Sequence, residues 1–268
     1  MKNKTNLTYI IPIVVLTAAL GIEWCFMIGA INNNNNTQSN NGPSSASSRQ
    51  NKSSSSASYA SAKEITSDEE ITSGEFASST ADENAISASG DIKATLSNIT
   101  VTKTGDSDGG DNTSFYGTNS AIIAKSGANL TIKNATITTD ANGANGVFSY
   151  GGSATTNNSS SDGTTVNFSD STITTKKNNA GGIMTTGGGT MNATNLTINT
   201  AGTSSAAIRS DRGGGTVTVN KGTYKTTGKG SPAIYSTADI TVKNATLVAT
   251  ASEGVVIEGK NSVTLENV

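Results

Sequence analysis

The chain has 268 residues and a formal net charge of −2, and charged residues make up 14% of it, against about 25% in an ordinary globular domain. This balance offers no basic surface for nucleic acid. The sequence holds no histidine and a single cysteine, Cys25. Ser–His and Cys–His catalytic arrangements, an internal disulfide and a cysteine-based metal site are therefore excluded.

Residues 1–31 predict a segment that crosses a membrane or directs export. Lys2 and Lys4 precede an apolar run from Tyr9 to Ile31, which is long enough to span a bilayer as a helix. The two lysines place the N-terminus inside and the rest of the chain outside. Two interpretations stay open: an uncleaved signal anchor, and a signal peptide cleaved near Ala30. Either one predicts a protein on the extracellular face of the membrane or secreted from the cell.

Residues 32–62 are almost entirely Asn, Ser, Ala and Gln. A segment of this composition cannot bury a core, so we expect a disordered spacer.

From residue 63 to residue 268 two short patterns recur. The first alternates apolar residues on either side of a central position, as in Leu130–Ile137 and Ile240–Leu247. That position is mostly Asn or Asp, the non-glycine residues best able to adopt a left-handed bend. It is occupied in turn by Ser73, Asn98, Asn134, Asp170, Asn195, Lys221, Asn244 and Asn267. The second pattern, small-apolar-x-small, is exemplified by Ala121-Ile122 and Ala233-Ile234.

Together the patterns predict an all-β, right-handed parallel β-helix of about eight coils, with an Asn ladder along the bend. One coil cannot bury its own apolar face, but stacked coils share a continuous core. A β-sandwich would also be rich in Thr and Gly, but it would not keep these columns without gaps. The sequence ends at Val268 with no polar cap after Asn267, which predicts a product truncated at its C-terminus.

The coils Ala233-Ile234-Tyr235-Ser236 and Ile240–Thr246 resemble the pectate-lyase-like right-handed parallel β-helix superfamily. They are most similar to its repetitive adhesin-like or carbohydrate-binding members from the surfaces of gut and clostridial bacteria. The resemblance covers roughly residues 65–268. It implies an extracellular protein that binds glycan, in a group where calcium is common.

Two insertions interrupt the coils, at Thr102–Ser120 and Ser149–Thr164. In the first, Asp106, Asp108 and Asp111 lie in a Gly-rich loop. They favour either a calcium site built from oxygen ligands or a solvated acidic loop. Phe115 and Tyr116 follow, and these rings would either stack on a sugar or fasten the loop to the coils. The second insertion is almost free of apolar residues and predicts a mobile loop.

A row of large residues is expected on the outer face of one sheet, because the x of the small-apolar-x-small pattern points away from the core. The row reads Ser87, Ile123, Phe148, Met184, Arg209, Tyr235 and Val256. An exposed apolar row marks an interaction site, here for a polysaccharide or a protein, unless a terminal segment or a missing C-terminal part covers it.

The resemblance also raises the possibility of a polysaccharide lyase, which would use clustered acidic calcium ligands and an arginine base, or of a hydrolase with paired carboxylates. Arg209 and Arg212 are the only arginines outside the spacer, and no outward acidic column accompanies them on adjacent coils. We therefore expect no catalysis. The sequence predicts a surface protein that binds an extracellular polysaccharide or a surface protein, with a lyase-like enzyme and an inert stalk as alternatives.

Overall fold

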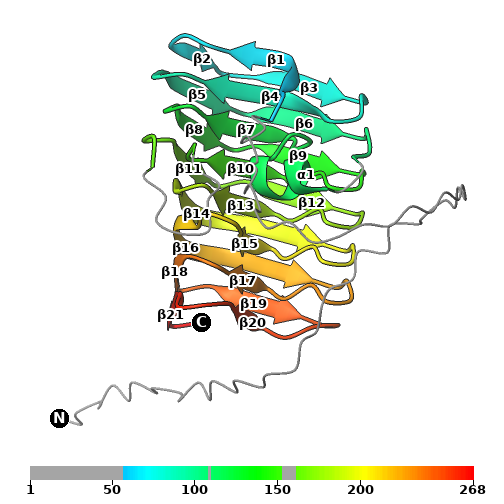
Figure 1. Cartoon of the computed structure of the whole chain (residues 1–268), viewed down its shortest axis with the longest axis vertical. Helices are drawn as coiled ribbons and strands as arrows, with labels where there is room; N and C mark the ends of the chain where they lie inside the picture. The colour runs from blue at the N-terminus through cyan, green and yellow to red at the C-terminus, as the bar shows by residue number, and fades with distance from the viewer. Residues whose placement is uncertain (1–56, 108–109, 153–160) are drawn as a thin grey trace, which may run out of the picture. The chain divides into compact units, whose positions relative to one another are not determined.

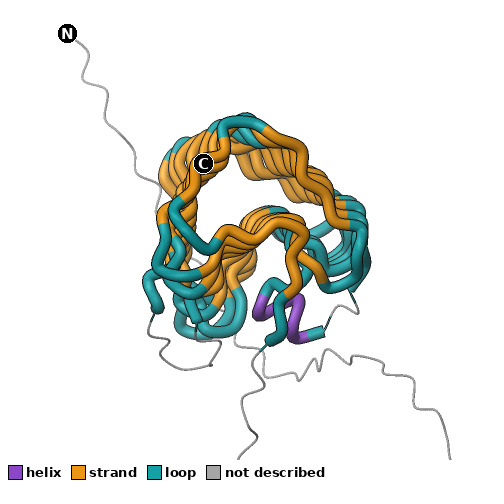
Figure 2. The backbone as a smooth tube through the Cα atoms, turned by 90° about the horizontal axis from the view of Figure 1, so that it is seen from above, coloured by secondary structure: helices purple, strands orange, loops and turns teal. Residues whose placement is uncertain are grey.

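The computed structural model describes residues 57–107, 110–152 and 161–268, and this part of the chain is a stack of parallel strands. Each of the first seven coils contributes a strand to each of three sides, and the last coil contributes to the first two. Figure 2 shows the three sides along the stack. The first side is an eight-stranded sheet. Its strands, in spatial order, are β1 (Ala60–Ile65), β4 (Glu83–Ser89), β7 (Ile122–Lys125), β10 (Val147–Tyr150), β13 (Ile183–Thr186), β15 (Ile208–Ser210), β17 (Ile234–Ser236) and β20 (Val255–Ile257).

The second and third sides belong to one sheet, because two long strands, β14 (Gly189–Thr200) and β16 (Gly215–Thr226), run through both. The second side also contains β2 (Glu69–Ile71), β5 (Lys93–Ser97), β8 (Asn129–Lys133), β11 (Thr165–Ser169), β18 (Asp239–Lys243) and β21 (Ser262–Glu266). The third side also contains β3 (Gly74–Ser78), β6 (Ile99–Lys103), β9 (Thr136–Thr139), β12 (Thr172–Thr175) and β19 (Thr246–Ala249).

The pairings join each strand to its counterpart in the next coil, and all of them are parallel. The chain thus winds as a solenoid of eight successive coils, and Figure 1 shows them stacked from blue to red. The predicted all-β parallel stack is confirmed. β1 begins at Ala60, before the boundary predicted at residue 63, because Ala60 and Ser61 already pair with Glu83 and Asn84.

No helix of the described residues is long and apolar enough to cross a membrane. The segment predicted at residues 1–31 lies outside the described residues, as does the predicted spacer up to residue 56.

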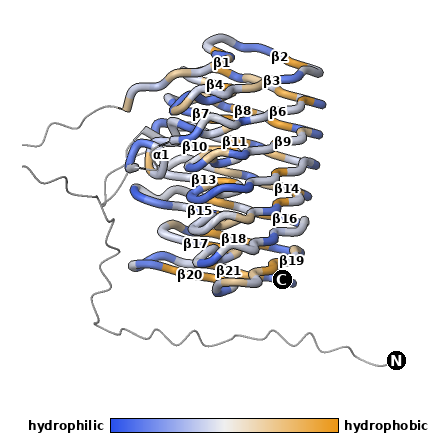
Figure 3. The backbone as a smooth tube through the Cα atoms, turned by 90° about the vertical axis from the view of Figure 1, so that its right-hand side faces the viewer, coloured by the Kyte–Doolittle hydropathy of each residue, from blue (hydrophilic) through white to orange (hydrophobic). Residues whose placement is uncertain are grey.

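Apolar side chains from all three sides fill the interior. In Figure 3 the backbone is coloured by hydropathy, and hydrophobic and hydrophilic stretches recur in every coil. Ile122, Leu130 and Ile137 of one coil are fully buried, and their counterparts in the neighbouring coils lie directly above and below them. Each such side chain contributes roughly 1.5–3 kcal/mol by leaving water.

The bend column adopts the predicted left-handed conformation in every coil except the first, where Ser73 is not left-handed. In the other seven coils the φ angle of the bend residue runs from 50° at Asp170 to 66° at Lys221. The Asn ladder is present in part. Nδ2 of Asn134 donates to Oδ1 of Asn98 at 3.3 Å, and Nδ2 of Asn195 donates to Oδ1 of Asp170 at 2.7 Å.

A second column consists of inward threonines at the end of the third side. In three successive coils the threonine hydroxyl closes the turn that follows by a hydrogen bond to a backbone carbonyl. The hydroxyls of Thr175, Thr200 and Thr226 donate to the carbonyl oxygens of Ala180, Ser205 and Ser231. Lys103 takes this inward position in the coil that precedes the first insertion, since it pairs with Thr139 of the next coil. Its Nζ donates to Gly105 O at 2.7 Å and to Thr80 O at 2.8 Å. Burial lowers the pKa of this amine to about 8.

The two ends of the stack differ. In the first coil Lys63 and Glu69 take inward positions, because they pair with Ile86 and Ala94 of the next coil. Their side chains form an ion pair of 2.9 Å over the core. In the last coil Leu265 lies in an inward column and is 47% exposed.

Asn195→Ala should lower the free energy of unfolding by about 1–2 kcal/mol, because alanine resists the left-handed bend and the bond to Asp170 is lost. Asn195→Gly should lower the free energy of unfolding by less, because glycine adopts the left-handed conformation without strain. Denaturant unfolding checks this, with Thr194→Ala, an exposed neighbour in the same strand, as the control. Unchanged stability of Asn195→Ala would contradict this account of the bend.

The buried Lys103 predicts a pH dependence of stability. Its folded pKa of about 8 lies below the ordinary value of 10.5, so the unfolded chain binds more protons between these two pH values. The free energy of unfolding should therefore rise with pH across that interval. The measured quantity is the difference in free energy of unfolding between the wild type and Lys103→Met at each pH. The titration of the tyrosines is common to both proteins and cancels in this difference. A difference that stays constant with pH would contradict the prediction.

Candidate functional site

The outward row predicted as an exposed interaction site is covered along its middle. Ile123, Phe148 and Met184 are fully buried and form a small apolar cluster of their own, with Tyr59 and Tyr150 packed against it. Ser87 is nearly buried as well. The prediction of an accessible row is wrong at these positions. The row is covered there, but by an internal insertion and not by the terminal segment or missing C-terminal part that was the alternative.

The covering segment is the first insertion. It leaves the third side after β6 and forms the short helix α1 (Asp111–Tyr116) outside the first side, as Figures 1 and 2 show. Gly117 ends the helix in the left-handed conformation, with φ 71°. A side chain there would collide with Phe148, because an added Cβ would lie 2.7 Å from the ring. Glycine thus lets the backbone lie directly on the ring.

Hydrogen bonds hold this segment to the first side at three levels. Nδ2 of Asn84 donates to Gly117 O at 2.8 Å, and Oγ1 of Thr186 donates to Phe115 O at 2.7 Å. The hydroxyl of Tyr59 donates to Tyr116 O at 2.9 Å. Burial raises the pKa of Tyr59 well above its ordinary value, so the tyrosine remains a donor. These contacts span coils far apart in sequence, so the segment acts as a brace.

Phe115 and Tyr116 fasten the insertion to the coils, which was one of the two interpretations of their sequence. The Tyr116 ring meets the Tyr150 ring edge-on, with centroids 5.6 Å apart. The guanidinium of Arg212 lies 3.9 Å from the centre of the Phe115 ring. Arg212 also approaches Asp111, with Nη1 3.6 Å from Oδ2.

The carboxylates predicted as calcium ligands do not converge in the described part of the chain. Oδ1 of Asp106 accepts the backbone N–H of Asn142 at 2.7 Å, and Asp111 faces Arg212. Asp108 lies outside the described residues. Among the residues that the structure describes, no group of three or more acidic, histidine or cysteine side chains is placed to hold a metal ion.

The row ends in a polar network on the last coils. Nη2 of Arg209 donates to Oδ2 of Asp211 at 2.8 Å, and the guanidinium carbon lies 5.8 Å from the centre of the Tyr235 ring. Burial, and then a hydrogen bond with the carboxylate of Glu258, raise the pKa of Tyr235. The network consists of Asp211, Arg209 and the Tyr235 ring, which come from two neighbouring coils.

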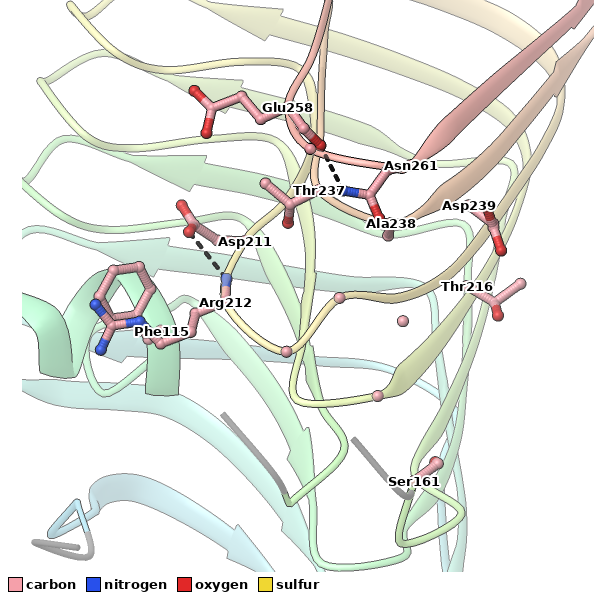
Figure 4. Close-up of a pocket in the computed structure, with 15 residues that line it drawn as sticks. Phe115, Ser161, Asp211, Arg212, Thr216, Thr237, Ala238, Asp239, Glu258 and Asn261 are labelled. Atoms are coloured by element: carbon pink, nitrogen blue, oxygen red, sulfur yellow. Dashed lines mark hydrogen bonds between the residues drawn. The ribbon is translucent and has the colours of Figure 1, made fainter. Parts of the chain in front are cut away.

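Beside this network is a groove of about 830 Å³, at the corner where the first side turns into the second. Figure 4 shows its polar side chains, with the Phe115 ring and the Arg212 guanidinium together at one end. Asp211, Asp239 and Glu258 come from successive coils, and Asn261 lies beside Glu258. The turn Gly213–Gly215 forms part of the groove wall. Because glycine has no side chain, the backbone of this turn faces the groove. We call this feature the corner groove.

The corner groove offers carboxylate, amide and hydroxyl groups and the edge of an aromatic ring. Ligand sites commonly combine such groups to orient a polar ligand. Its two nearby arginines are already engaged: Arg209 with Asp211, and Arg212 with Asp111 and Phe115. An arginine side chain stays protonated in proteins, so neither guanidinium is a ready base.

The structure brings Phe115, Arg209 and Tyr235 of the predicted site to the groove or to the network beside it. Ile123, Phe148 and Met184 continue the same row toward the N-terminal coils but are buried. Sequence reasoning missed Asp239, Glu258 and Asn261. Glu258 and Asn261 lie in the turn between β20 and β21, and Asp239 begins β18 directly after the equivalent turn of the coil before. A comparison of that turn across coils would have found the acidic residues, because equivalent turns stack over one another.

Comparisons of this chain with family models, with curated proteins and with solved structures found no match.

Gly117→Ala should lower the free energy of unfolding by about 1–3 kcal/mol, because the new Cβ would overlap the Phe148 ring. Gly163→Ala is a matched control, since Gly163 is also left-handed but has nothing within 4 Å of an added Cβ. The difference between the two variants in denaturant unfolding isolates the steric overlap. Equal effects would show that the insertion does not press on Phe148.

Proposed function

We propose that this protein is a non-catalytic extracellular surface protein that binds a glycan chain in the corner groove. The observation that carries the proposal is the gathering of Phe115, Asp211, Asp239, Glu258 and Asn261 around one groove. Sugars present many hydroxyl groups and a weakly apolar ring face. Carboxylate and amide oxygens accept from the hydroxyls, and the edge of the Phe115 ring contacts the apolar face.

The proposed ligand is extended. The lining residues of the corner groove come from the coils of β13, β15, β17 and β20, so a chain bound there would run along the stack. Neighbouring coils are separated by about 4.7–4.9 Å, the spacing of hydrogen-bonded strands. A polymer meets similar groups at each coil, which favours a polysaccharide over a compact small molecule.

The charge of the corner groove supports an uncharged or positively charged glycan. Asp211 is neutralised by Arg209 at 2.8 Å, and Arg212 is turned toward Asp111. Asp239 accepts a hydrogen bond from Ser262 at 2.7 Å. No cation pairs with Asp239 or Glu258 within the described ranges. A polyuronate would therefore meet repulsion.

The proposal includes the finer features expected from sequence: a right-handed helix of the pectate-lyase-like kind, and export through the N-terminal segment to the cell surface or beyond. The stacked parallel coils are compatible with the first. The two lysines before the apolar run support the second.

The test is calorimetric titration of the full-length chain in mild detergent with cello-oligosaccharides, chitosan oligosaccharides and oligogalacturonates. We expect binding of a neutral or amine-bearing probe and none of oligogalacturonate. Asp239→Asn combined with Glu258→Gln should weaken binding of the neutral or amine-bearing probe by about tenfold, equivalent to about 1.4 kcal/mol.

Glu70→Gln combined with Glu75→Gln is the control, because these carboxylates are exposed on the first coil, away from the corner groove. Binding of oligogalacturonate alone would refute the charge argument. Failure of all three probes, or full affinity in the groove variant, would refute the groove as the site.

A further inference from the structure

A row of outward-facing threonines runs along the third side, one in each coil from the second to the seventh. The row is Thr100, Thr136, Thr172, Thr197, Thr223 and Thr246. These residues stand in register because each pairs with the next in the parallel ladder. All are exposed except Thr172, which is half-buried.

A second outward row lies beside the first, two residues further along each strand. It reads Thr102, Thr138, Thr174 and Asn199 over β6, β9, β12 and β14. Within each row the residues are about 4.7–4.9 Å apart, and the two rows are separated by about 6.6–6.8 Å along the strand. We call these two rows, over these four coils, the threonine array.

The hydroxyls of the first row are not used by the fold. Inward threonines of the same strands, such as Thr175 and Thr200, donate to backbone carbonyls and close the turns. In the described part of the chain, no hydrogen bond engages the outward hydroxyls of Thr136, Thr172 or Thr197. Each hydroxyl can donate one hydrogen bond and accept two, so the array presents regularly spaced groups that can exchange water for a ligand.

The threonine array carries no charge. Glu75 precedes its first row in the first coil, and Lys225 follows its second row in the sixth. Between them every outward residue is Thr or Asn. The array also lacks the large aromatic side chains and Arg that dominate protein–protein contacts. These features fit an uncharged partner whose own surface repeats regularly and bears hydroxyl groups.

We propose that the threonine array is a second binding surface, which adheres to the face of a crystalline, uncharged polysaccharide. Threonine offers a hydroxyl for the sugar hydroxyls and a methyl group for the apolar parts of the ring. Registered pairing fixes the positions of these groups before contact, so little conformational entropy is lost on binding. The surface lies on the third side, whereas the corner groove joins the first side to the second, so the inference does not rest on the groove.

The test is a pull-down of the full-length chain, in mild detergent, on microcrystalline cellulose and on crystalline chitin. The array variant is Thr136→Lys combined with Thr172→Lys and Thr197→Lys. We expect this variant to bind the solid at least about tenfold more weakly than the wild type, measured as the protein concentration at half-saturation. The control is Thr131→Lys combined with Thr218→Lys and Thr241→Lys, which adds the same charge to outward positions of the second side.

A second array variant, with Val in place of Thr136, Thr172 and Thr197, keeps the branched shape that strands favour and removes only the hydroxyls. It should also lose adsorption while keeping the wild-type unfolding temperature. The groove variant of Asp239 and Glu258 should adsorb normally, which separates this proposal from the previous one.

Adsorption that survives in both array variants would overturn the proposal, as would a wild-type protein that adsorbs to neither solid. Ice is another lattice of hydroxyl-like groups, so thermal hysteresis of the solution is measured in parallel. Hysteresis that depends on the array, without adsorption to either polysaccharide, would also overturn the proposal and identify ice as the partner.

Discussion

The structure depends on the in-register parallel pairing of each coil with the next. This pairing places the inward apolar residue of one strand on the inward apolar residue of its neighbour, as Val147 lies on Ile122 and Val166 on Leu130. No coil could bury its own apolar face, and the core exists only as a shared column. The same constraint sets the outer surface, where threonines and asparagines form rows because their strands cannot slip past one another.

Two polar positions show how the stack accommodates departures from its repeat. Lys103 replaces an inward threonine in the coil that feeds the insertion, and its ammonium takes over the turn-closing role with Gly105 O and Thr80 O. Lys63 and Glu69 replace inward apolar residues in the first coil and neutralise one another over the end of the core. A charge in such a column opposes further strand addition, since burying the pair would require removing it from water.

The first insertion brings residues from distant coils together and so shapes the surface. By lying over Phe148 it closes the middle of the outward row, and by carrying Phe115 to Arg212 it builds one end of the corner groove. Packing and the proposed binding surface are therefore linked through a single segment. The outward row changes from an apolar cluster under α1 to the Arg209–Tyr235 network where that cover ends.

The sequence by itself determined the coil number, the inward columns and the left-handed bends at Asn98, Asn134 and their equivalents, because each is a local pattern repeated at every coil. It also located the insertions. Only the tertiary structure decided what the insertions cover. Burial of Ile123, Phe148 and Met184 depends on where a long segment returns, and no local pattern carries that contact. The corner groove escaped sequence analysis for the same reason: Phe115 and Glu258 are distant in the chain, and only the stacking brings them to one surface.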